Sequence, residues 1–295
     1  MDRRRCLKVA GLAAGAALWR RESNFAAGLS REFAFSLKQP HKDGIRSRLG
    51  LQLFTVRQLL QKDAEATFRA VAAIGYSEVE MFGFGGNAFI QDPLFGRTPR
   101  QVRQLLDDCR LRVPSTQIAG SLNNVDAIAA TIAELGIEHL IVGMPPEFLT
   151  VTPNGPVVSG VKDADQIKRL AERLNIMGST CRASGLGFGY HNHHMEFAPI
   201  GGQLAYDLLL KETEPDLVRM ELDVGWVQAA GVDPLPYLAQ YPGRFIACHL
   251  KDFDPARPLP ADPSRIPIAN MVRMVAPGDG KIGRASCRER VYVLV

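Results

Sequence analysis

The sequence predicts an α/β fold, a (β/α)8 TIM barrel that is truncated at its C-terminus, with about seven strands present and the eighth βα unit missing. From about Arg48 onward, short apolar runs alternate with amphipathic stretches at helical spacing, the pattern of successive βα units. The apolar runs are nearly continuous, as expected of parallel strands buried on both faces. Polar residues recur where these runs end, which is where barrel enzymes carry their chemistry.

The expected strands and helices follow one another in strict alternation. The strands are expected at Gly50–Thr55, Glu78–Phe82, Val113–Ile118, His139–Val142, Gly187–His191, Val218–Asp223 and Phe245–Leu250. The helices are expected at Ala64–Ala73, Pro99–Cys109, Val125–Leu135, Asp163–Ser184, Gly202–Glu212 and Pro234–Gln240. No glycine-rich GxGxxG loop follows the first strand, which favours a barrel over an open dinucleotide-binding sheet. Without an eighth strand, the first and seventh strands are expected to be open edges.

The composition is that of an ordinary globular protein, with 46% hydrophobic and 22% charged residues. The formal net charge of +4 comes largely from arginines and lysines near the two ends, so no basic stripe points to a nucleic-acid partner. The five cysteines are scattered without a CxxC pair, which indicates neither a zinc motif nor a disulfide framework.

We divide the chain into four segments. Residues 1–27 resemble a twin-arginine-type signal, because Arg3-Arg4-Arg5 precede a short Ala/Gly-rich apolar run that cannot span a bilayer; a basic, disordered arm is the alternative. Residues 28–47 are a linker and 48–283 the incomplete barrel. We interpret 284–295 as a non-native tail, because its apolar end follows no crossover helix. We therefore expect export to the periplasm by the twin-arginine route and no stable membrane span.

The densest polar cluster closes the fifth strand, in the run Tyr190-His191-Asn192-His193-His194-Met195-Glu196-Phe197. Side chains alternate along a strand, so His191 and His193 are expected to point together into the barrel mouth. Two imidazoles on one face are a natural ligand pair for a divalent transition metal. We assign His191 to the metal and His193 or Glu196 to proton removal. The alternative is that these histidines only hydrogen-bond neighbours in a βα loop.

The sixth strand ends with Glu221 and Asp223 on one face, followed by Trp226. A carboxylate inside an apolar barrel is costly unless it is paired or bound to a metal. We therefore expect Asp223, nearer the mouth, to be a metal ligand, and Glu221, one layer deeper, to hydrogen-bond a ligand histidine. Trp226 offers a ring face for a sugar, or is a packing residue.

The seventh strand places His249 and Lys251 on the inward face. We expect His249 to be the third metal ligand, because two other strands already present ligands at that level. Lys251 is expected to bind a substrate oxygen or to act as an acid, with a rim salt bridge to Asp252 as the alternative. The remaining candidates for substrate binding lie on the first three strands: Gln52, Glu80 and Gln117.

Taken together, these landmarks resemble the sugar phosphate isomerase/epimerase family of the xylose-isomerase-like barrels, over roughly Arg48 to Ile282. The matching runs are Leu49–Leu53, Gly75-Tyr76 with Glu78-Val79-Glu80, Tyr190–His193, Leu222–Trp226 and His249–Asp252. In such barrels the metal is usually held by a strand-five Glu, a strand-six Asp, a strand-seven His and a strand-eight Glu. Asp223 and His249 match two of these positions, and His191 stands where the strand-five Glu is expected.

The resemblance implies a metal-dependent sugar isomerase or epimerase that acts on a keto-sugar or sugar phosphate. A divalent ion (Mn, Zn, Co or Mg) polarises the carbonyl, and a nearby base removes the adjacent proton. The alternatives are a 3-keto-glycoside lyase or hydrolase, an inosose-dehydratase-like lyase, and a non-catalytic sugar-binding barrel. The expected partner is a small carbohydrate, and a homo-oligomer is compatible with the sequence.

Overall fold

The structure is a computed structural model that describes residues 49–85, 92–118, 125–152, 155–158, 160–254 and 274–275. The expected signal at 1–27, the linker at 28–47 and the tail at 284–295 all lie outside these ranges. Within them, no helix has the length and apolar character that crossing a membrane requires.

The centre of the fold is a parallel seven-stranded sheet in the order β1-β2-β3-β4-β7-β10-β11. The strands span Gly50–Gln52, Glu78–Phe84, Arg112–Ile118, His139–Val142, Gly187–His191, Arg219–Asp223 and Phe245–His249. The order follows the chain, as in a barrel, with β1 and β11 at the two ends of the described sheet. The predicted parallel βα architecture is confirmed.

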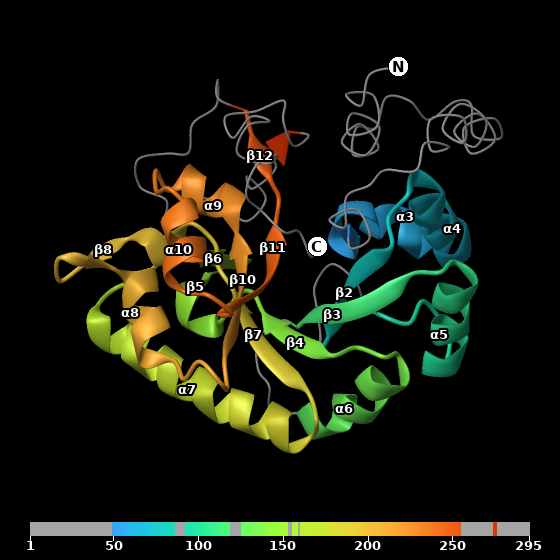
Figure 1. Ribbon diagram of the computed structural model, residues 1–295, viewed down its shortest axis with the longest axis horizontal. Coiled ribbons are helices and arrows are strands. Elements are labelled where there is room, and N and C mark those ends of the chain that lie inside the picture. The colour runs from blue at the N-terminus through green and yellow to red at the C-terminus, as the bar shows by residue number, and fades with distance from the viewer. Residues whose placement is uncertain are drawn as a thin grey trace.

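Helices follow the outer side of the curved sheet, as Figure 1 shows for α5, α6 and α7. In chain order, the helices from α3 to α10 span Arg57–Lys62, Ala64–Ile74, Pro99–Asp108, Val125–Glu134, Ala164–Ala183, Ala205–Glu212, Val224–Ala229 and Leu235–Gln240. The start of α5 illustrates the local logic: the Thr98 hydroxyl accepts from the Gln101 N–H, and the Gln101 side chain accepts from the Thr98 N–H. This capping box, followed by Pro99, begins the helix where the sequence predicts it.

The sheet is curled into part of a barrel, and one buried contact demonstrates it. Five strand spacings separate β2 from β11, which in a flat sheet would be about 24 Å. Nevertheless, Glu80 Oε2 on β2 lies 2.7 Å from His249 Nε2 on β11. The two halves of the sheet therefore face each other across a closed interior.

Two predicted boundaries are wrong for local reasons. The first strand ends at Gln52 rather than at Thr55, because the Gln52 side chain accepts a hydrogen bond from the Phe54 N–H and starts a 3₁₀ turn at Leu53–Val56. Helix α8 begins at Ala205 rather than at the predicted Gly202. There, strands β8 (Pro199–Ile200) and β9 (Gln203–Leu204) form a hairpin around two glycines with positive φ.

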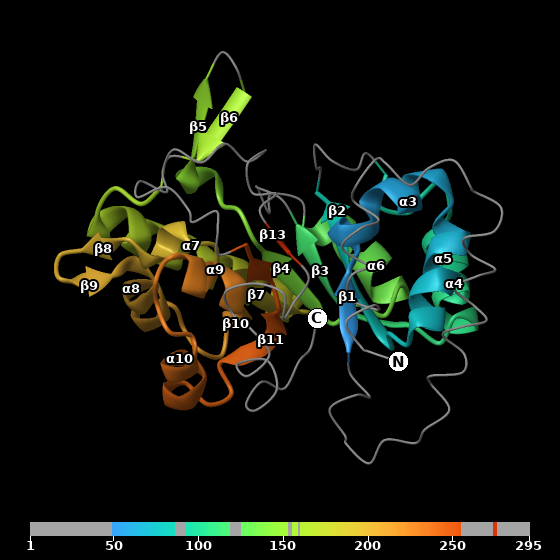
Figure 2. The same ribbon diagram turned by 90° about the horizontal axis from the view of Figure 1, so that it is seen from above.

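A second hairpin, also absent from the prediction, extends the connection between β4 and α7. Its strands are β5 (Leu149–Thr152) and β6 (Gly155–Val158), and it projects away from the sheet in Figure 2. A short antiparallel pair, β12 (Asp252–Phe253) with β13 (Met274–Val275), follows β11.

Candidate active site

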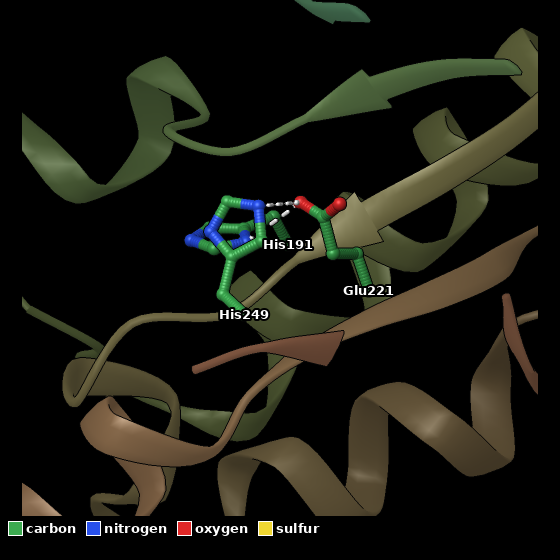
Figure 3. Close-up of side chains that lie close together, drawn as sticks. All are labelled: His191, Glu221 and His249. Atoms are coloured by element: carbon green, nitrogen blue, oxygen red, sulfur yellow. Dashed lines mark hydrogen bonds and ion pairs between the residues drawn. The ribbon is translucent and has the colours of Figure 1, made fainter. Parts of the chain in front are cut away.

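The candidate site lies where β7, β10 and β11 end. Parallel register sets Glu221 beside His191 and Asp223 beside His249, so side chains from three strands reach one level. Figure 3 shows the Glu221 carboxylate directed at the imidazoles of His191 and His249. All three side chains are buried.

The three side chains are close enough to share one small ligand. One ligand atom from each of His191, Glu221 and His249 lies within 4.8 Å of the other two. Glu221 Oε2 lies 2.9 Å from His191 Nδ1 and 3.3 Å from His249 Nε2. The two rings are tilted against each other with centroids 4.5 Å apart.

Strands from the opposite half of the sheet complete the network. Gln117 Nε2 on β3 donates to Glu221 Oε2 over 2.9 Å, and the Ser115 hydroxyl donates to Glu80 Oε1 over 3.0 Å. With the contact between Glu80 and His249, one connected set of polar groups bridges the interior. Gln117 and Glu80, both predicted to line the site, are therefore brought to it.

Burial and charge act in opposite directions on the central pair. Burial lowers the pKa of His249, but the Glu221 and Glu80 carboxylates outweigh it and raise that pKa to about 10. Burial raises the pKa of Glu221, but the neighbouring imidazoles hold it well below its usual range. The pair is therefore an imidazolium next to a carboxylate at neutral pH.

The pKa values of Glu80 and His191, the other two titratable members of the network, are both shifted toward the neutral form. Burial, reinforced by the charge of Glu221, raises the pKa of Glu80 to about 7. Burial and the positive His249 lower the pKa of His191. The network therefore carries fewer charges than its number of titratable groups suggests.

Asp223 joins the site to the next helix. Its Oδ1 accepts from the Trp226 N–H over 3.0 Å and caps α9, while its Oδ2 is in ion-pair contact with the Lys251 ammonium. The same Oδ2 lies 3.5 Å from His191 Nε2 and 3.9 Å from His249 Nδ1. Lys251 thus pairs with Asp223, whereas the sequence suggested Asp252 as its alternative partner.

His193 is the half-buried imidazole of the site. Its ring centroid lies 5.0 Å from that of His191 and 5.8 Å from that of Trp226. Burial and the positive charges around it lower the pKa of His193 well below its usual range. Its buried Nδ1 has no hydrogen-bond partner within the described ranges. His193 is thus an uncharged imidazole beside a charged network.

Both carboxylate oxygens of Glu196, the other candidate base, accept hydrogen bonds from nearby residues of the chain. The Tyr190 hydroxyl donates to one carboxylate oxygen over 2.6 Å, and the His193 N–H donates to the other over 3.0 Å. Burial raises the pKa of Glu196 to about 7. The contacts show Glu196 fixing the backbone of His193, and a catalytic role for it stays a prediction.

Two residues predicted to bind substrate have other contacts in the structure. The Gln52 side chain caps the turn after β1. The Trp226 ring is almost fully buried, packed between His193 and Phe253. Sugar stacking on Trp226 stays a prediction that requires part of this packing to open.

Asn192 is a site residue that the sequence analysis left without a role. Its side-chain oxygen accepts from the Asp223 N–H over 2.9 Å, and its amide nitrogen donates to the Asp223 carbonyl over 3.3 Å. This double contact ties the end of β7 to the end of β10. The position of Asn192 between His191 and His193 is the sequence feature that could have indicated a role for it in the site.

The donor set fits a divalent metal. His191 and His249 provide imidazole nitrogens, while Glu221 and Asp223 provide carboxylate oxygens at the same level. Buried nitrogen and oxygen donors of this kind suit zinc and neighbouring transition metals. The predicted ligands are His191, Asp223 and His249. In the structure the Glu221 carboxylate lies closer to both histidines than that of Asp223 does, so Glu221 and Asp223 are both candidate carboxylate ligands.

The comparisons with known proteins agree with this architecture. Residues 68–291 match the family described as xylose isomerase-like TIM barrel. The chain belongs to that family. A solved structure of a sugar phosphate isomerase/epimerase from Parabacteroides distasonis is 28% identical, with a TM-score of 0.58 over 70% of this chain and 79% of that one.

Two further proteins are similar to this xylose isomerase-like barrel. An inosose dehydratase from Lacticaseibacillus casei is 26% identical over 189 residues, which span 60% of this chain and 59% of that enzyme. The IolI protein, whose structure holds a bound zinc atom, is 14% identical with a TM-score of 0.51, over 79% of this chain and 80% of that one. At that identity the likeness concerns the fold alone.

Proposed function

We propose that this barrel is a metal-dependent enzyme that removes the proton beside the ketone of a keto-cyclitol or keto-sugar and expels the hydroxyl one carbon further on as water. The observation that carries the proposal is the placement of an uncharged imidazole, His193, and an ammonium, Lys251, beside the same Trp226 ring. A dehydration of this type needs one base and one acid of different kinds.

The charges of the site support elimination over two-base epimerisation. The carboxylates of Glu221 and Asp223 are already paired, with imidazoles and with Lys251 respectively. An epimerase that uses two carboxylates on opposite faces of the sugar needs both of them free. His191 occupies the strand-five position at which such a carboxylate would stand.

Each step is assigned to a group of this chain. His193 accepts the carbon-bound proton on a ring nitrogen, because the imidazole is neutral and half-buried. The ammonium of Lys251 donates a proton to the departing hydroxyl. The products are an enone and water, so atoms and charge balance.

A metal ion has a defined place in this scheme. His191 and His249, with Glu221 or Asp223, would hold it, and when bound it polarises the ketone so that the adjacent C–H becomes more acidic. Support for zinc as the ion comes from the donor types, imidazole nitrogens and carboxylate oxygens.

The test follows deuterium entry and water loss together. The purified chain, supplied with Zn²⁺, Mn²⁺, Co²⁺ or Mg²⁺, is incubated in D2O with inososes, keto-sugars and 3-keto-glycosides, and the products are followed by NMR. We expect deuterium at the carbon beside the ketone and an enone product. Deuterium entry with an isomeric ketose as product would replace dehydration by isomerisation, the activity named for the Parabacteroides relative. No deuterium entry with any substrate and metal would contradict the proposal.

A further inference from the structure

Gly225 lies where the site meets the chain segment that carries Lys251. It is the second residue of α9, directly after the capping residue Asp223 and Val224. Lys251 and Phe253 lie on the segment that follows β11. These two stretches of chain are 26 residues apart and touch at Gly225.

The contact leaves no room for a side chain. A Cβ built on Gly225 would lie 2.6 Å from the Lys251 Cβ, 2.9 Å from the Lys251 carbonyl oxygen and 3.0 Å from Phe253 Cε2. Two of these three atoms belong to, or are bonded to, the backbone of Lys251, so no rotamer change relieves the clash. The segment from Lys251 to Phe253 therefore sits directly on the Gly225 backbone.

This close approach sets the position of the Lys251 ammonium. With the Lys251 backbone packed against Gly225, the Lys251 ammonium contacts Asp223 Oδ2, and its Nζ lies 5.7 Å from the centroid of the Trp226 ring. Phe253 packs against the same ring, with centroids 5.0 Å apart. Displacement of the segment would separate the ammonium from Asp223 and uncover Trp226 together.

We propose that Gly225 is a positioning residue, which holds Lys251 at the Asp223 carboxylate by admitting the segment from Lys251 to Phe253 against α9. The effect on catalysis rests on the proposed function, in which Lys251 donates a proton to the departing hydroxyl. The placement itself is independent of turnover.

The test uses Trp226 as the reporter. The chain contains two tryptophans, so a Trp19→Phe background isolates Trp226. In that background Gly225→Ala is expected to red-shift the emission and to cause a severalfold rise in acrylamide quenching. Gly178→Ala is the matched control, because its Cβ would meet the Leu217 carbonyl at 2.4 Å, a clash on α7 in contact with neither Lys251 nor Trp226. It is expected to lower stability and leave the Trp226 spectrum unchanged.

The double variant Gly225→Ala/Lys251→Gly adds a Cβ at position 225 and removes the Cβ at position 251 that it would meet at 2.6 Å. It is expected to recover the Trp226 spectrum in part, or to recover folding if Gly225→Ala alone does not fold. An unchanged spectrum in folded Gly225→Ala, or no recovery in the double variant, would overturn the proposal. In a chain with measured dehydration, Gly225→Ala is expected to lower kcat as far as Lys251→Met does; a chain without that activity still tests the placement by fluorescence.

Discussion

An exposed ion pair lies at the amino ends of the strands, and a buried one lies at their carboxyl ends. At the amino ends, Arg112 pairs with Glu138, and 60% and 57% of the two side-chain surfaces are exposed. At the carboxyl ends, the His249 side chain is 4% exposed and lies between Glu80 and Glu221, each 1% exposed. The chemistry of the groups is similar, and only the surroundings differ.

That difference decides what each end is suited to do. Water screens the pair of Arg112 with Glu138, so it joins neighbouring strands at little cost and with little gain. The carboxyl-end network is buried, so its charges interact strongly and shift one another's pKa values. Catalysis needs such shifted groups, which explains why the candidate site lies at one end of the sheet only.

The largest expected effect is on proton removal. His193→Gln is expected to slow deuterium entry into a responsive ketone by a factor of about 10²–10⁴, because it deletes the uncharged base. His139→Gln changes the same residue type at the amino end of β4 and is the control, expected to keep the rate of the unaltered chain. Equal rates in both variants would remove His193 from the mechanism.

The next effect concerns stability. His249→Gln is expected to lower the free energy of unfolding by about 3–5 kcal/mol at pH 7, since it leaves the buried carboxylates of Glu80 and Glu221 without their cation. Glu138→Gln, which removes the ion pair that is exposed on both sides, should cost no more than about 1 kcal/mol. Urea unfolding of the metal-free proteins measures both. A loss of equal size in the two variants would mean that the buried network is no stronger than the exposed one.

The pH dependence sharpens the same comparison. The pKa of His249 is raised from 6.5 to about 10, so its contribution is fully present below pH 6.5 and is lost as the pH rises through about 10. The stability difference between the metal-free chain and His249→Gln should therefore shrink between these values. A difference that stays constant to pH 10.5 would show that His249 is not held as a cation.

A smaller effect is expected where the loop of His193 is fixed. Tyr190→Phe removes the hydroxyl that donates to Glu196 and should cost about 1–2 kcal/mol of unfolding free energy. Tyr237→Phe, which removes a half-buried hydroxyl from Asp207, is the control and should cost less. A negligible cost for Tyr190→Phe would indicate that Glu196 keeps its place without this contact.

The fold follows from the sequence wherever local pattern determines structure. The strands at His139–Val142 and Gly187–His191 lie where they were predicted, because their apolar runs are bounded by polar residues and glycine. Helix α9 was not predicted, since its six residues are too few to show a helical period. Its cap is Asp223, a residue already assigned to the metal on chemical grounds.

The candidate site was only partly predictable, for a different reason. Alternation along each strand identified His191, Asp223 and His249 as inward-facing residues. It did not show that Glu80 meets His249, because those residues are 169 positions apart and touch only when the sheet curls. The engagement of Glu196 by Tyr190 depends on a loop conformation that no periodicity encodes.

Zinc binding is the most direct test of the proposed metal site, which lies among buried side chains at the carboxyl ends of the strands. Titration calorimetry of the metal-free chain with Zn²⁺ should show one site per chain. Arg112→Ala should retain that site, and His249→Ala should lose it. Absence of zinc binding in the unaltered chain, or undiminished binding by His249→Ala, would contradict the account.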